Sequence, residues 1–194
     1  MNILSETRMM VLASLFAALI AVGAFIAIPI GPVPIVLQNF FVLLTGLLLG
    51  PRWGLVACGV YLLAGALGLP VFAGGTGGIG RFFGPTGGYL LAYLPAVFIT
   101  GFISQNKKKA VVWDSVAMIL ASMVIYALGA SWLKFSTGMT WSKSLAVGMF
   151  PFLLGDALKI AAAIVVAKTA RPMIHQYSNS GQVRGQGKAE KSLP

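Results

Sequence analysis

Residues 9–28 read MMVLASLFAALIAVGAFIAI, a run of twenty residues without a charged side chain. A helix of about 20 apolar residues is long enough to cross the hydrocarbon core of a bilayer. The run is longer than the apolar core of a typical signal peptide and does not lead into a soluble domain, so we do not expect it to be cleaved. It is the first predicted transmembrane helix.

The rest of the chain has the same apolar character. Of its 194 residues, 58% are hydrophobic and 9% are charged, and the mean hydropathy is +0.89. Soluble domains carry about 25% charged residues, and the polar side chains of this chain are too few to cover a globule in water. The composition argues against a soluble enzyme, a disordered chain and a disulfide scaffold, and predicts an integral membrane protein.

Glycine, proline and charged residues divide the apolar sequence into candidate spans. The second and third candidates are short and meet at Gly50-Pro51-Arg52, which is typical of a tight turn between helices. The predicted fold is an all-α bundle of six transmembrane helices within residues 1–176, followed by a polar, disordered cytoplasmic tail over 177–194. The predicted spans are 9–28, 36–50, 53–69, 85–104, 111–133 and 144–170.

The net charge of +10 is explained by orientation in a membrane rather than by nucleic-acid binding, because Lys and Arg gather at the ends of the apolar runs. Counted over alternating connections, ten lie on one side, three on the other, and Lys159 lies within a span. Since positive residues favour the cytoplasm, we expect a multi-pass protein with both termini cytoplasmic. The outward connections are then 29–35, 69–84 and 134–143.

Asp156 and Lys159 are ionisable residues in the outer half of the predicted sixth span. Their spacing places both side chains on one helix face. A charge near the bilayer centre costs about 2.5–3.5 kcal/mol on insertion scales, so we expect the pair to face the bundle interior. Either it is an ion pair that fixes helix packing, or it is a ligand site in which Asp156 accepts N–H groups and Lys159 donates to an oxygen.

The external connection 69–84 is rich in glycine. Residues 75–80 match G-x-G-x-x-G, but no strand and no βαβ unit surrounds the match, so it does not predict a dinucleotide site. Glycine lets backbone lie close to a bound molecule, which makes Gly75, Thr76, Gly77 and Gly78 candidate ligand-binding residues. The alternative is a flexible external loop.

Other residues are candidates because of their position. Gln38 lies at the outer end of the second span and Tyr89 begins the fourth, beside the glycine-rich connection, although either alone is more typical of helix packing. Ala13, Ala17 and Ala21 form a stripe of small residues on the first span. Such a stripe packs within the bundle or docks another membrane protein.

The sequence lacks the patterns of common catalytic and metal sites. It has no Ser/His/Asp set, no H-E-x-x-H and no P-loop, so it does not hydrolyse nucleotide through a P-loop. Cys58 is the only cysteine and His175 the only histidine, which excludes a His/Cys metal cluster. Of the four carboxylates, only Asp156 lies well inside a predicted span. We expect no enzyme activity, no metal and no cofactor.

Five motifs, taken in order, closely resemble the BioY family, the biotin-specific substrate-binding (S) components of energy-coupling factor (ECF) transporters. The likeness is dense over 33–101 and returns at 154–159. The motifs are Val33-Pro-Ile-Val-Leu-Gln-Asn, Leu49-Gly-Pro-Arg, Gly68-Leu-Pro-Val-Phe-Ala-Gly-Gly-Thr-Gly-Gly, Gly84-Pro-Thr-Gly-Gly-Tyr and Gly155-Asp-Ala-Leu-Lys. The resemblance implies a six-helix protein of a prokaryotic cell membrane that captures external biotin for ATP-driven uptake.

The resemblance also implies which residues bind biotin. By position, Asp156 and Lys159 match the polar pair of the family's sixth helix, Thr76 the polar position of its glycine-rich loop, and Tyr89 the tyrosine after its Gly-Pro-Thr motif.

Two positions depart from other members of the family. Some members carry Asn at the position of Thr76 and a basic residue at that of Leu90, so the group that meets the biotin carboxylate in this chain is open. Arg81 is a possible substitute, and is otherwise a charge on a loop.

The partners implied by the resemblance are a transmembrane T component, docked on the alanine stripe of the first span, and two ATPase subunits that use the ATP. We also expect contact with membrane lipid and none with nucleic acid. Two other functions remain open from the residues alone: a membrane scaffold or assembly protein with Asp156 and Lys159 as internal glue, and a stand-alone vitamin facilitator.

Overall fold

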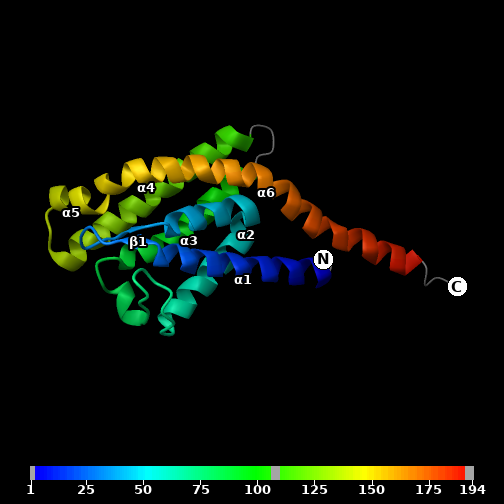
Figure 1. Cartoon of the computed structure of the whole chain (residues 1–194), viewed down its shortest axis with the longest axis horizontal. Helices are drawn as coiled ribbons and strands as arrows, with labels where there is room; N and C mark the ends of the chain where they lie inside the picture. The colour runs from blue at the N-terminus through cyan, green and yellow to red at the C-terminus, as the bar shows by residue number, and fades with distance from the viewer. Residues whose placement is uncertain (1–2, 106–109, 191–194) are drawn as a thin grey trace.

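The computed structural model describes residues 3–105 and 110–190, which form packed helices with a small hairpin at one end (Figure 1). Two antiparallel strands of two residues each connect the first two helices. In chain order the elements are α1 (Ile3–Phe25), β1 (Ala27–Ile28), β2 (Ile35–Val36), α2 (Gln38–Ala66), the 3-10 helix η1 (Ile79–Phe82), α3 (Gly87–Ser104), α4 (Ala110–Thr137), α5 (Trp141–Gly148) and α6 (Phe150–Glu190).

The described chain contains five helical stretches that are long and apolar enough to cross a membrane. They are Glu6–Phe25, Gln38–Ala66, Gly87–Ser104, Val111–Thr137 and Trp141–Pro172. The predicted all-helical architecture is therefore confirmed, with several helices that could cross a membrane. Among the described residues the candidate membrane-spanning stretches number five rather than six, because most of the second and third predicted spans lies in α2.

Helix α2 is broken in the middle at Gly50. The backbone of Gly50 has a φ of +75°, a left-handed conformation that glycine adopts without steric cost, and Pro51 follows it as the first residue of a new helical segment. In Figure 1 the two segments of α2 form a V. The bend lies against α3, where a Cβ on Gly101 would collide with the backbone of Pro51. The expected Gly-Pro-Arg turn is therefore a sharp bend packed on a neighbouring helix.

The alanine stripe of α1 contributes to packing within the chain. Ala13 and Ala17 are buried and belong to the hydrophobic core, whereas Ala21 is half-buried. Because α1 packs mainly on α2 and also touches α6, these small side chains let the helices approach closely. Their burial favours the packing interpretation over a docking face at these residues.

Helix α6 follows the short helix α5 and continues well beyond its apolar part. The stretch able to cross a membrane ends at Pro172, whereas the helix ends at Glu190. The structure is thus helical over 177–190, where the composition predicts a disordered tail. Extending a formed helix adds one hydrogen bond per ordered residue and avoids the cost of nucleation. Residues 191–194 of the expected tail lie outside the described residues.

Candidate functional site

A cavity lies between the β1–β2 hairpin, the glycine-rich connection 69–84 (below, the glycine-rich segment) and helices α2, α3, α4 and α6. Its empty volume, including the part open to the surroundings, is about 780 Å³. The hairpin contributes Pro32, Val33, Pro34 and Val36 to the wall, so the connection between the first two helices covers part of the cavity.

Three residues predicted from separate parts of the sequence line this cavity. Gln38 donates from Nε2 to the Tyr61 hydroxyl at 2.8 Å. Tyr89 donates from its hydroxyl to the carbonyl of Gly148 at 2.8 Å, which ties α3 to the end of α5. Thr76 donates from Oγ1 to the carbonyl of Ala73 at 3.0 Å within the glycine-rich segment. The structure therefore brings α2, α3 and this segment to one cavity.

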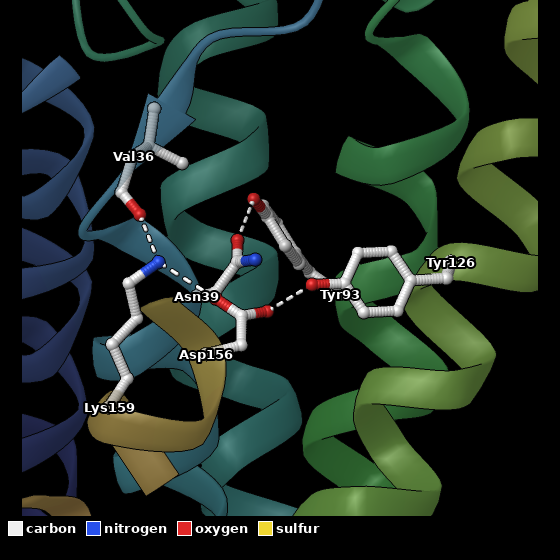
Figure 2. A network of polar contacts seen from close by, with 6 residues as sticks. All are labelled: Val36, Asn39, Tyr93, Tyr126, Asp156 and Lys159. Atoms are coloured by element: carbon white, nitrogen blue, oxygen red, sulfur yellow. Dashed lines mark hydrogen bonds and ion pairs between the residues drawn. The ribbon is translucent and has the colours of Figure 1, made fainter. Parts of the chain in front are cut away.

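Asp156 and Lys159 form an ion pair (Figure 2), in which the Asp156 side chain is buried and the Lys159 side chain is part-buried. Lys159 Nζ lies 2.8 Å from Asp156 Oδ1 and also donates to the carbonyl of Val36 at 2.8 Å. The Tyr126 hydroxyl donates to Asp156 Oδ2 at 2.5 Å. Tyr126 and Val36 line the cavity, whereas the ion pair itself does not. Asp156 and Lys159 therefore contact two residues of the cavity wall, Tyr126 and Val36, but do not line the cavity themselves.

A second polar pair, formed by Asn39 and Tyr93, lines the cavity beside Tyr126. The Tyr93 hydroxyl donates to Asn39 Oδ1 at 2.8 Å, and both side chains are buried. Neither residue was among the predicted site residues, although Tyr89 and Tyr93 are four residues apart and hence share a helix face. Asn39 also follows Gln38 directly. That spacing and that adjacency are the signals that could have found them.

The central glycines of the glycine-rich segment do not line the cavity. They shape the backbone that positions the residues that do. Gly75 and Gly78 have φ values of +69° and +94°, which favour glycine. Gly78 donates its N–H to the carbonyl of Gly65 at 2.7 Å. Gly77 lies so close to Leu69 that a Cβ would collide with the Leu69 carbonyl. The roles of these three glycines are therefore conformation and close approach.

Gly77→Ala is expected to destabilise the protein, because the new methyl group would push the segment away from the carbonyl of Leu69. Overpacking of this kind costs about 1–3 kcal/mol. Gly80→Ala is the matched control, since Gly80 lies in η1 with nothing within 4 Å of an added Cβ. Thermal unfolding of the purified protein in detergent should show a lower midpoint for Gly77→Ala only; equal midpoints would contradict the packing described.

A second ion pair lies away from the cavity, near the beginning of α4. The Arg171 Nη2 atom lies 2.9 Å from Asp114 Oδ1 and donates to the carbonyl of Leu47 at 3.3 Å. The side chain of Asp114 is 2% exposed. Asp114 is thus buried although it lies in the first turns of α4, whereas Asp156 is the carboxylate that the sequence places well inside a span. The two partners were missed because they are 57 residues apart in the sequence. Within the described residues, no three His, Cys, Asp or Glu side chains could hold a metal ion.

Comparison with known proteins gives a consistent set of relatives. A family model described as the BioY family matches residues 1–176. The chain is 43% identical over 157 residues to the probable biotin transporter BioY of Pyrococcus horikoshii, covering 81% of this chain and 92% of that protein. It is 41% identical over 160 residues to the biotin transporter BioY of Thermotoga maritima, covering 82% and 94%.

A solved structure is also similar to this chain over nearly its whole length. It is the crystal structure of the S-component for biotin from an ECF-type ABC transporter, with a TM-score of 0.82 and 31% sequence identity. The match covers 89% of this chain and 95% of the other. The helical arrangement described above is therefore that of a known membrane architecture.

Proposed function

Because the chain belongs to the BioY family, we propose that it is the substrate-binding component of an ECF-type transporter and that its cavity binds biotin. It is a transporter component and not an enzyme. The observation that carries the proposal is the cavity itself, in which a few converging polar groups lie among apolar side chains. This combination is typical of sites that fix the orientation of a small ligand.

The chemistry of biotin matches the cavity wall. Its ureido group offers two N–H donors and one carbonyl acceptor, and its fused rings and valeryl chain are apolar. Asn39, Tyr93 and Tyr126 present amide and hydroxyl groups that complement the ureido group. Phe72 and Phe152 supply apolar surface. We propose that the ureido group lies against the first set and the rings against the second.

The ion pair lies behind this wall, where the Tyr126 hydroxyl covers Asp156. We propose that Asp156 and Lys159 bind the ureido group, with a ligand N–H taking the place of the Tyr126 hydroxyl on Asp156. Lys159 holds the carbonyl of Val36 and hence the hairpin that covers the cavity. Both residues are one turn apart on α6, which keeps acceptor and donor together.

The residues predicted from the sequence have distinct roles in this proposal. Gln38, Thr76 and Tyr89 form the wall with their side chains. The positive φ of Gly75 and Gly78, together with the close approach of Gly77 to Leu69, gives the glycine-rich segment its shape. The side chains therefore meet the ligand, and the glycines position the residues that do so.

We propose that the chain crosses the membrane six times, with the two segments of α2 as separate spans. The bend at Gly50 supports this count. The excess of Lys and Arg on one set of connections supports cytoplasmic termini. In that orientation the cavity faces the exterior of a prokaryotic cell, where biotin is captured, and the glycine-rich segment is an external loop.

Energy for uptake has to come from partners, which we propose are a transmembrane T component and two ATPase subunits. A T component would meet the membrane-facing side of α1. Ser14 and Ala18 are exposed there, four residues apart, whereas Ala13 and Ala17 are buried. Membrane lipid covers the remaining apolar surface. The two alternatives are a scaffold role and transport without ATPase subunits. Titration with biotin and a flux measurement in liposomes distinguish them from the proposed function.

Saturable binding of biotin to the purified protein is the expected result of isothermal titration calorimetry. A ligand that binds only the folded state adds about 2.7 kcal/mol of stability at a hundredfold excess over Kd, so biotin should raise the unfolding temperature and other vitamins should not. Absence of saturable binding would reject the proposal and favour a scaffold. Biotin flux into liposomes that lack ATPase subunits would indicate a facilitator.

A further inference from the structure

We propose that Arg81 binds the carboxylate of biotin and makes the site selective for the anionic ligand; this inference rests on the proposed function. Arg81 lies in η1 and is the only charged residue among the described residues that line the cavity. The side chain is exposed, which places it at the mouth of the cavity. A ligand with one carboxylate thus meets one cation in an otherwise uncharged wall.

The charge of Arg81 is not neutralised by the buried carboxylates. Asp156 is paired with Lys159 and accepts from Tyr126, and Asp114 is paired with Arg171. Neither acid is therefore available to Arg81. A guanidinium presents several N–H donors in a fixed plane that matches a carboxylate, and Arg81 keeps this capacity for a ligand.

The other basic residues near this end of the bundle have different positions. Lys159 is engaged by Asp156 and the carbonyl of Val36. Lys134 lies over the Trp141 ring, 5.2 Å from its centre. Leu90 lines the cavity, so this part of the wall is apolar. Lys143 is exposed on α5 and does not line the cavity, so among the described residues Arg81 is the cation in the cavity wall.

The backbone around Arg81 holds it beside the cavity and adds to its effect. The N–H of Arg81 donates to the carbonyl of Gly78 at 3.1 Å, and the Trp132 indole of α4 donates to the carbonyl of Gly84 at 3.0 Å. Thr86 precedes α3, does not cap it with its side chain, and lines the same cavity. The N-terminus of α3 next to Thr86 also favours a negative group.

The test pairs the charge of the ligand with the charge of the residue. Affinities of biotin and of its uncharged amide are measured by titration calorimetry for the unmodified chain, Arg81→Gln and Arg81→Lys. The unmodified chain is expected to bind biotin at least tenfold more tightly than the amide. Arg81→Gln should lose most of this preference, and Arg81→Lys should retain part of it.

Lys143→Gln is the matched control, because Lys143 is exposed on α5 and does not line the cavity. An equal loss of preference in Lys143→Gln would overturn the inference, because it would mean that the long-range electrostatic field of the protein, and not contact with Arg81, selects the anionic ligand. Equal weakening of both ligands in Arg81→Gln, or unchanged preference, would also overturn it. If the unmodified chain binds neither ligand, the proposed function itself fails, which is a separate outcome.

Discussion

Asp156→Asn is expected to weaken biotin binding by more than tenfold, which corresponds to about 1.4 kcal/mol, and to destabilise the ligand-free protein. The substitution leaves the part-buried Lys159 ammonium without its ionic partner and replaces the charged acceptor proposed for a ureido N–H by a neutral amide oxygen. Removing one partner of a buried pair typically costs about 3–5 kcal/mol of stability. Lys159→Ala is expected to weaken binding by more than tenfold as well, because the hairpin loses its bond at Val36.

A double variant separates the two roles of this pair. Asp156→Asn combined with Lys159→Met removes both charges, and replacing a whole buried ion pair is often close to neutral for stability. We therefore expect the double variant to unfold near the temperature of the unmodified protein while its affinity for biotin stays low. Both are measured on the same preparation, by thermal unfolding and titration calorimetry. Affinity that returns with stability would assign the pair a purely structural role.

Much of the fold follows from hydropathy alone, because a chain in lipid has to satisfy its backbone groups within helices. The charge-free run 9–28 largely coincides with α1, and the apolar run 85–104 with α3. The local signal at Gly50-Pro51 located the bend. Whether a bent helix counts as one element or two depends on backbone geometry, and hydropathy does not contain that information. Hydropathy also does not predict the extension of α6 to Glu190, because a polar segment can continue a helix that is already formed.

Part of the cavity wall was predictable, because polar residues at the ends of predicted spans lie there. Gln38, Thr76 and Tyr89 were predicted in this way and line the cavity, and the pairing of Asp156 with Lys159 follows from their spacing on one helix. The sequence did not reveal that Tyr126 comes between this pair and the cavity. Tyr126 and Asp156 are 30 residues apart in the sequence and lie on two different helices. Their contact therefore depends on tertiary packing, which single-sequence periodicity does not encode.

The ion pair of Asp114 and Arg171 supplies a prediction that separates stability from binding. Arg171→Met is expected to destabilise the protein by about 3–5 kcal/mol, because the Asp114 carboxylate would stay buried without a cation. The Leu47 carbonyl on α2 would also lose a donor. Thermal unfolding in detergent measures the effect. Lys168→Met is the matched control, since Lys168 is exposed on the same helix, and its unfolding temperature should stay near that of the unmodified protein.

Biotin affinity is the second measurement on Arg171→Met, made at a temperature where the variant is folded. Arg171 and Asp114 are not part of the cavity wall or of the hydrogen-bonded groups behind it, so the dissociation constant should change by less than about threefold, or about 0.7 kcal/mol. A loss of affinity as large as that of Asp156→Asn would mean that the two ion pairs act through one rigid α6. Loss of stability with retained affinity would instead show that Arg171 fixes the bundle independently of the residues that bind the ligand.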